Sequence, residues 1–232
     1  MSMEIKKVAL AGIVGLAAYG FAGSAAAQTC AGSSATATDG TWECVEYQDG
    51  TSTTYNAAPS NVWFGPAGTS AASDTFTFTG NSTLNYSFIS ANCPLTLEGQ
   101  VRYDASGNAI GIRVLDGTVG GSGTCASIGI SNFPWYASDN TTFTNSSSVS
   151  GAGTPGDVNP PAGGVTTANI GSITVEVFGS AVCTGYLPDV DFANGNPVDN
   201  SSSFDFSGTI VGTSCGVNGV LSSVSNEDVN AW

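Results

Sequence analysis

The chain has 232 residues, with 18 acidic residues, four basic residues and no histidine, and its formal net charge is −14. The absence of histidine excludes Ser-His-Asp and Cys-His catalysis and every zinc or haem site with a histidine ligand. Because proteins bind nucleic acids through lysine and arginine, we expect no nucleic-acid partner. Hydrophobic residues make up 41% of the chain and charged residues 9%, so we expect a folded protein.

The first 27 residues have the pattern of a secretory signal peptide. Lys6 and Lys7 precede an apolar run over residues 8–22, and small residues follow up to Ala27. A basic start, a short apolar segment and an Ala-x-Ala site are typical of an export signal that is removed. A retained membrane anchor would need a longer apolar segment. We therefore expect a protein that is secreted or held at a bacterial cell surface, without a transmembrane segment in the mature chain.

All the cysteines follow the export signal: Cys30, Cys44, Cys93, Cys125, Cys183 and Cys215. An even number of cysteines in an exported protein predicts disulfides, although six cysteines allow fifteen pairings. Two of the intervals are equal and end in similar Gly- and Thr-rich stretches, which favours the pairs Cys93 with Cys125 and Cys183 with Cys215. Cys30 would then pair with Cys44. We expect each bridge to contribute about 3 to 4 kcal/mol. A thiolate metal site is disfavoured because no Cys-x-x-Cys pair is present.

Alternating apolar and polar residues predict antiparallel strands over residues 75–79, 84–88, 110–114, 173–177 and 203–207. The following pairs are typical of tight turns between strands: Asp49-Gly50, Gly80-Asn81, Asp116-Gly117 and Asn194-Gly195. No stretch after the export signal has helical periodicity. We therefore expect an all-β fold. A sandwich and a barrel both fit this pattern, and we favour an antiparallel β-sandwich with Greek-key or meander connections.

The mature chain divides into two sections. Residues 28–60 form an N-terminal section that contains Cys30 and Cys44 and a hairpin-like stretch over residues 41–55. Residues 61–232 form the predicted sandwich domain. Within this domain, residues 146–166 are rich in Gly, Pro and Ser and are expected to form a long exposed loop between the two cysteine pairs.

One acidic stretch is a candidate calcium site, formed by Asp189, Asp191, Asn194, Asn196 and Asp199. Carboxylate and amide oxygens on a glycine-containing loop are the ligands that Ca²⁺ prefers. The spacing does not fit an EF-hand, and the same residues are also common in solvated turns, which is the interpretation we favour. Apart from calcium at this loop, we expect no cofactor.

Two strand glutamates, Glu98 and Glu176, are the candidates for glycoside hydrolysis. This reaction needs two carboxyl groups about 5 to 10 Å apart, and outward-facing strand residues explain the glutamates equally well. The chain has no nucleophile elbow, P-loop or dinucleotide motif, so we expect no enzymatic activity. Trp63, Phe133 and Trp135 are candidate contacts for an apolar or sugar ligand, although such residues are more often part of the core.

Two stretches resemble the secreted Pra-type proteins of the alkane oxidation protein activator family. They run over residues 93–101 and 117–135, and the second contains Cys125-Ala-Ser-Ile128 followed by Pro134-Trp135. Residues 207–221 are similar to the second half of that family, so the resemblance covers roughly residues 74–221. It implies an exported, non-enzymatic β protein associated with hydrocarbons, the cell surface or biofilm, and it supplies no catalytic residue. The chain departs from the family in its N-terminal section and in the long insert after Trp135.

Together these observations predict a secreted structural or adhesive surface protein that contacts hydrocarbon, a biofilm matrix or copies of itself. One alternative is a fibre subunit, in which the N-terminal segment is donated to the open sheet edge of a neighbour to build a filament. The other is a binding module for an apolar ligand or a carbohydrate.

Overall fold

The computed structural model describes residues 45–51, 53–55, 58–59, 61–103, 109–143, 157–158, 166–195 and 201–231. The export signal, Cys30, Cys44, Asn196 and Asp199 lie outside these residues. Most of the predicted loop 146–166 does so as well, but Asp157–Val158 within it forms the short strand β9. No helix in the described ranges is long and apolar enough to cross a bilayer.

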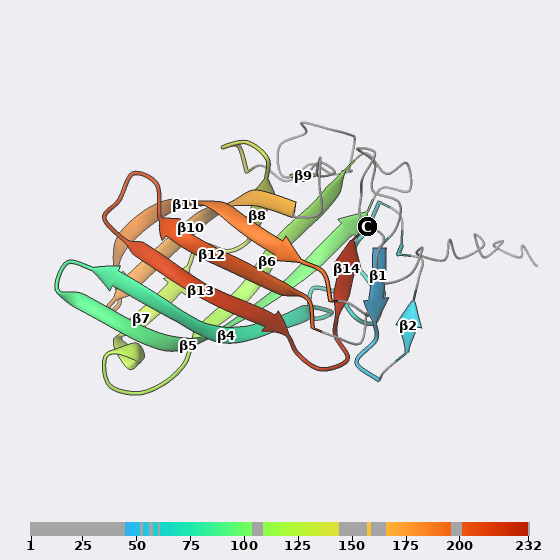
Figure 1. The fold of residues 1–232 in the computed structure, drawn as a ribbon, viewed down its shortest axis with the longest axis horizontal. Coiled ribbons are helices and arrows are strands. Elements are labelled where there is room, and N and C mark those ends of the chain that lie inside the picture. The colour runs from blue at the N-terminus through green and yellow to red at the C-terminus, as the bar shows by residue number, and fades with distance from the viewer. Residues whose placement is uncertain are drawn as a thin grey trace, which may run out of the picture.

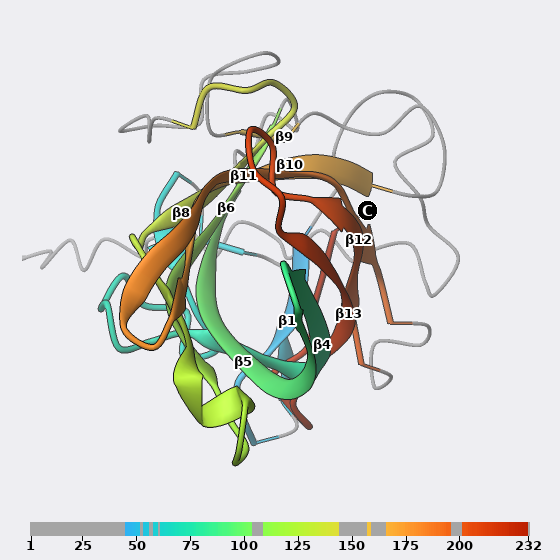
Figure 2. The ribbon, with the colours of Figure 1, turned by 90° about the vertical axis from the view of Figure 1, so that its left-hand side faces the viewer.

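The fold is a closed barrel of eight antiparallel strands (Figure 1). Around the ring the strands are β5 (Ile89–Tyr103), β4 (Phe76–Tyr86), β13 (Gly216–Ser223), β12 (Ser203–Thr209), β11 (Ser180–Ala193), β10 (Thr166–Val177), β8 (Trp135–Ser138) and β6 (Ile110–Val119). β6 then pairs with β5 and closes the ring. Figure 2 shows the ring nearly end-on. Outside it, β7 (Ile128–Ser131) pairs with β10 and follows the single-turn helix η2 (Cys125–Ser127).

The predicted sandwich is wrong, although the all-β, antiparallel prediction is confirmed. A sandwich would leave two sheets with free edges, whereas here β5 pairs with β4 on one side and with β6 on the other. The register of β5 against β6 shifts between Glu98 and Gly99, and β10 has three shifts against β11. Such bulges increase local twist and bend strands, which allows a sheet to curl until its first and last strands meet.

Two predicted turns lie inside long strands. Gly80-Asn81 is in the middle of β4, and Asp116-Gly117 is within β6. At Gly80 a side chain would collide with the backbone carbonyl of Val220 on the neighbouring strand, and at Gly117 a Cβ would lie 2.6 Å from Leu97 Cδ2. These glycines are therefore required by close packing against the neighbouring strand. Asp49-Gly50 does form the predicted turn, with Gly50 at a φ of 81°.

One end of the barrel, which we call the hairpin end, is formed by the turns β4–β5, β10–β11 and β12–β13 and by the loop 120–127. These turns lie together at the left in Figure 1 and face the viewer in Figure 2. Two disulfides brace this end. Cys93–Cys125 joins β5 to η2, and Cys183–Cys215 joins β11 to the start of β13, with Cα atoms 5.6 and 6.2 Å apart.

The opposite end, the plug end, is covered by a small sheet made of β14 (Val229–Ala231), β1 (Val45–Gln48) and β2 (Thr54–Tyr55). The N-terminal section is thus tied to the C-terminal strand, since Val45 pairs with Ala231 and β1 pairs with β2 as the predicted hairpin. Nearby, β3 (Trp63–Phe64) adds to β5 and β9 adds to β6. Val45 and Val229 belong to the main hydrophobic core, so this sheet packs onto the barrel.

The plug end also holds the buried polar residues of the described chain, apart from Thr174. They are Gln48, Gln100, Arg102, Ser138, Ser202, Ser223, Asp228 and Asn230. Several are paired with one another or with backbone. Asp228 accepts hydrogen bonds from the Ser223 hydroxyl and from the backbone N–H of Ser202, and Asn230 exchanges two with the backbone of Gly195. The burial of these hydrogen-bonded groups is therefore compensated.

Candidate functional site

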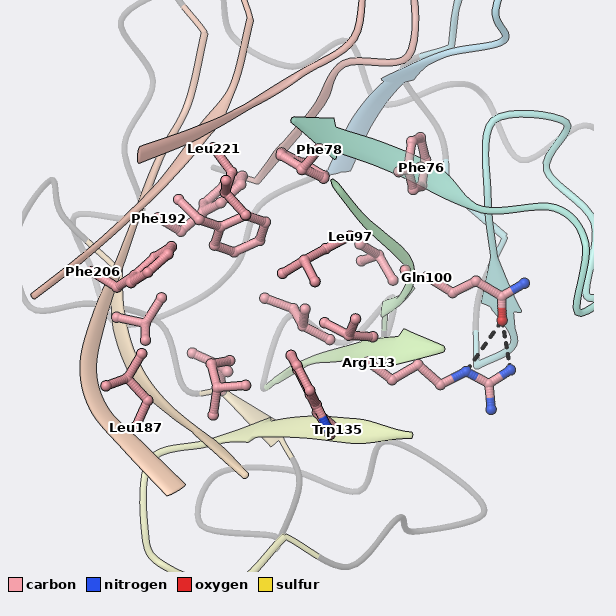
Figure 3. A pocket seen from close by; sticks show the side chains of 18 of the residues that line it. Phe76, Phe78, Leu97, Gln100, Arg113, Trp135, Leu187, Phe192, Phe206 and Leu221 are labelled. Carbon is pink, nitrogen blue, oxygen red and sulfur yellow. Dashed lines mark hydrogen bonds between the residues drawn. The ribbon is translucent and has the colours of Figure 1, made fainter. Parts of the chain in front are cut away.

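The barrel encloses an apolar cavity of about 150 Å³. All eight ring strands contribute to its wall, with side chains that alternate inward along each strand. Figure 3 shows these side chains converging on the middle of the barrel. They include Phe76, Phe78, Leu97, Ile112, Trp135, Val175, Leu187, Phe192, Phe206 and Leu221. At the plug end Val45 and Val229 complete the wall.

The charged group nearest to the cavity points away from it. Arg113 lines the wall, but its guanidinium donates to the Gln100 side-chain oxygen at 2.5 and 3.2 Å on the far side (Figure 3). The Gln100 amide nitrogen in turn donates to the carbonyls of Ala71 and Asp74. These bonds hold the polar atoms in the strap over residues 65–75, so the space inside the barrel is bordered by hydrocarbon.

A second, smaller cavity of about 50 Å³ lies toward the hairpin end. Leu84, Cys93, Val119 and Ile128 belong to its wall alone. Both cavities share the following lining residues: Ser82, Leu95, Ile130, Val175 and Val217. The two spaces are therefore separated only by a common layer of side chains, and the apolar interior extends from the plug end almost to the hairpin end.

The predicted aromatic contacts divide between two places. Trp135 is buried, lines the main cavity and stacks on Phe133 with ring centroids 4.4 Å apart. Its indole N–H donates to the Ser131 carbonyl at 3.0 Å. Trp63 lies elsewhere, on β3, where the guanidinium carbons of Arg102 and Arg113 lie 4.5 and 4.6 Å from its ring centroid.

The Trp63 cluster explains how two arginines are accommodated close together. Arg102 is almost completely buried. The Arg113 pKa is lowered, first by burial and further by the neighbouring Arg102, while Tyr136 acts in the opposite direction. Both guanidinium groups contact the Trp63 ring, and these cation–π contacts offset part of the cost of burying two positive charges close together. The cluster fastens β3 to β5 and β6, and Trp63 does not line the cavity.

The described residues of the predicted calcium loop have separate partners. Asp189 is exposed, and Asp191 accepts a hydrogen bond from the Thr167 hydroxyl at 2.5 Å. Asn194 pairs with the backbone of Ala231 through both its oxygen and its nitrogen. Across the residues that the structure describes, no group of three or more His, Cys, Asp or Glu side chains could hold a metal ion.

The two candidate catalytic glutamates lie on different parts of the barrel wall. Glu98 is on β5 and accepts from the Thr75 hydroxyl at 3.4 Å, while Glu176 is on β10 and accepts from the Ser131 hydroxyl at 2.6 Å. β5 and β10 are three strand steps apart around the ring, which corresponds to roughly 14 Å at the usual strand spacing. This is wider than the separation of about 5 to 10 Å that glycoside hydrolysis requires.

The predicted pairs Cys93–Cys125 and Cys183–Cys215 are both formed, which fits folding in an oxidising compartment. Sequence reasoning missed the cavity and the exposed Phe88 and Phe178. Phe88 was placed in a strand but lies in the β4–β5 turn, and Phe178 occupies the β10–β11 turn with Gly179. A two-residue X-Gly turn between apolar stretches was the available signal at residues 178–179.

A family model described as alkane oxidation protein activator PraA/PraB-like matches residues 50–230. The chain belongs to this PraA/PraB-like family. The matched range runs from the β1–β2 turn into β14, so it includes the whole ring, both disulfides and all the cavity-lining residues except Val45 and Ala231. The family is named for activation of alkane oxidation and not for an enzymatic reaction of its own. Comparison with curated proteins and comparison with solved structures each found no match.

Proposed function

We propose that this PraA/PraB-like protein is a secreted, non-enzymatic binding protein that takes up a small apolar molecule of the hydrocarbon class inside its barrel. The observation that carries the proposal is the cavity of about 150 Å³ enclosed by aliphatic and aromatic side chains. Eight-stranded barrels have interiors that are either filled by side chains or wide enough for one small ligand.

The lining defines the chemistry of the ligand. A dry cavity of this volume lined by Leu, Ile and Phe binds molecules the size of benzene. Because Arg113 and Gln100 use their polar atoms on each other outside the cavity, a charged or strongly hydrogen-bonding ligand would lose its hydration without replacement. The site therefore favours an uncharged hydrocarbon, in agreement with the alkane in the family's description.

Secretion is supported by the export-signal pattern of the first 27 residues and by the two disulfides. The adhesive and biofilm functions stay predictions. The fibre alternative is less favoured, because each of the eight ring strands already has two neighbours and the ring offers no free edge to a donated strand.

The test is a pair of substitutions on one strand. Val217 lines both cavities, whereas Val220 on the same strand is half exposed on the outer wall. Val217→Phe should fill the shared layer, and Val220→Phe is the matched control. Titration of the purified protein with benzene and with n-hexane, followed by nuclear magnetic resonance, should show saturable binding in the wild type.

We expect Val217→Phe to weaken the binding of these probes at least tenfold and Val220→Phe to leave it unchanged. Ile112→Phe, on another part of the wall, is a second filling variant in case Val217→Phe does not fold. Equal binding by the filling and control variants, or no saturable binding by the wild type, would refute an interior site.

A further inference from the structure

The hairpin end exposes apolar side chains at the tips of three adjacent hairpins. Phe88 in the β4–β5 turn is 93% exposed, Phe178 in the β10–β11 turn is 77% exposed and Val211 in the β12–β13 turn is 40% exposed. Since β5, β4, β13, β12, β11 and β10 follow one another around the ring, these three turns form one continuous arc of the rim (Figure 2). We call Phe88, Phe178 and Val211 the rim residues.

Phe178 occupies a backbone conformation that its side chain disfavours. Phe178 and Gly179 have φ angles of 52° and 72°, the signs of a type I′ turn, in which Asn, Asp and Gly are the usual residues. An exposed phenyl ring gains no burial to offset this strain. Ser87, which precedes Phe88, is also at a positive φ of 54°. Strained residues that a fold retains often mark functional positions.

The hairpin end is also free of charged residues, in a chain whose formal net charge is −14. Residues 82–95, 118–131, 177–187 and 207–223 contain no Asp, Glu, Lys or Arg. The nearest carboxylate, Glu176, accepts a hydrogen bond from the Ser131 hydroxyl. Around the rim residues the exposed polar groups are neutral hydroxyls and amides, such as those of Ser90, Asn92 and Thr184. Charge is thus confined to the remainder of the molecule.

The rim is held rigidly. Cys93–Cys125 and Cys183–Cys215 both lie within these uncharged segments. The Phe178 N–H donates to the Ser127 carbonyl at 2.7 Å, and the Val211 N–H donates to the Tyr186 carbonyl at 2.9 Å. A surface whose apolar groups are already fixed in place loses little conformational entropy when it binds.

We propose that the hairpin end rests on a zwitterionic lipid interface, with Phe88 and Phe178 inserted among the acyl chains. Aromatic tips suit the acyl region, and the neutral hydroxyls and amides beside them suit the headgroup region, where they keep hydrogen-bond partners. Ser90, Asn92 and Thr184 each have one neighbouring side-chain partner, but a bare hydrocarbon surface would remove water from their other hydrogen-bonding positions and offer nothing in its place. An anionic bilayer would repel a protein of this charge. The proposal goes beyond the interior site and does not rest on it.

The experiment is co-sedimentation of the purified protein with phosphatidylcholine vesicles. Phe88→Ser and Phe178→Asn should each lower the partition coefficient roughly tenfold, because each removes one phenyl ring that would be inserted in the bilayer. The double variant should lower the coefficient further. Val220→Asn is the control, since it removes an exposed apolar residue from the barrel wall away from the rim. It should leave partitioning unchanged.

A second readout addresses the strain at Phe178. Asn is favoured at the positive φ of a type I′ turn, so Phe178→Asn should raise the melting temperature while it lowers vesicle binding. Reduced binding therefore cannot be attributed to unfolding. The proposal is overturned if the wild type does not sediment with phosphatidylcholine, if it binds phosphatidylglycerol vesicles more strongly, if it binds only hexadecane droplets, or if the rim variants bind as well as the wild type.

Discussion

The two ends of this barrel are closed by different physical means. At the plug end, polypeptide covers the opening, and the polar groups beneath it, such as Gln100, Asp228 and Asn230, are buried and hydrogen-bonded. At the hairpin end the tips of the turns are exposed within the described part of the chain, the segments that form it carry no charged residue, and two covalent bridges hold the strands. The plug end is thus closed by the chain itself, whereas the hairpin end is the surface for which we propose a lipid partner.

The two ends also differ in the charged residues that they tolerate. A covered end can tolerate buried cations such as Arg102 because aromatic and polar partners surround them. At the hairpin end, the absence of charged side chains lowers the cost of the contact with lipid that we propose. The interior cavities extend from one end toward the other, so a ligand inside would be shielded at the plug end and close to the rim at the hairpin end.

The largest expected effect on the free energy of unfolding comes from removing a disulfide at the hairpin end. Replacing both members of a bridge with Ala, in Cys183→Ala/Cys215→Ala or Cys93→Ala/Cys125→Ala, should lower the free energy of unfolding by about 3 to 4 kcal/mol. Each bridge spans 32 residues, so the two double variants should lose similar amounts. Urea unfolding measures the loss. A loss below about 1 kcal/mol would mean that hydrogen bonds alone hold this end.

A smaller effect is expected from opening the hydrogen-bond network near the plug end. Gln100→Leu keeps the side-chain volume but leaves the Ala71 and Asp74 carbonyls and the Arg113 guanidinium without this partner. We expect a loss of about 2 to 3 kcal/mol, because Gln100 is fully buried and the change removes its hydrogen bonds to two carbonyls and to a charged guanidinium. The exposed Asn92→Leu change on the same strand, which removes one surface hydrogen bond to Thr83, is the control and should cost less than 1 kcal/mol. Equal losses would show that the strap does not depend on Gln100.

The sequence allowed the local structure to be predicted better than the closure of the barrel. Apolar alternation identified segments of β4, β6, β10 and β12, because the two-residue period is a local property. The equal cysteine intervals identified both described bridges. Closure depends on the pairing of β5 with β6 and on the bulge at Glu98, and neither leaves a signal in one sequence.

The candidate site was the least accessible to sequence reasoning. Cavity residues such as Leu97, Val175 and Leu221 come from strands on opposite sides of the ring, so their convergence is a property of the closed fold. Two glycines also led to a wrong prediction, since Gly80 and Gly117 were predicted to form turns but instead permit the close approach of the neighbouring strand. Trp135 alone among the predicted aromatic contacts lines the cavity, because only its position in the ring directs it inward.

The smallest predicted effect concerns the β1–β2 turn of the plug end. The Asp49 pKa is lowered to about 2, first by the Thr51 hydroxyl and then by the Thr51 N–H, with smaller contributions from the Thr53 N–H and the Tyr55 hydroxyl. A carboxyl group whose pKa is lower in the folded state stabilises that state above its ordinary pKa. This contribution disappears as the pH falls from about 4 to about 2.

Protection of the Thr51 and Thr53 amides against hydrogen exchange should therefore decrease over that pH range, after correction for the intrinsic exchange rate. Asp49→Asn should show weaker protection that does not titrate there. The Phe178 amide, which donates to a backbone carbonyl at the uncharged hairpin end, is the internal control and should keep its protection. Parallel loss of protection at Phe178 would mean that acid unfolds the whole barrel. In that case the two ends would not respond to acid independently.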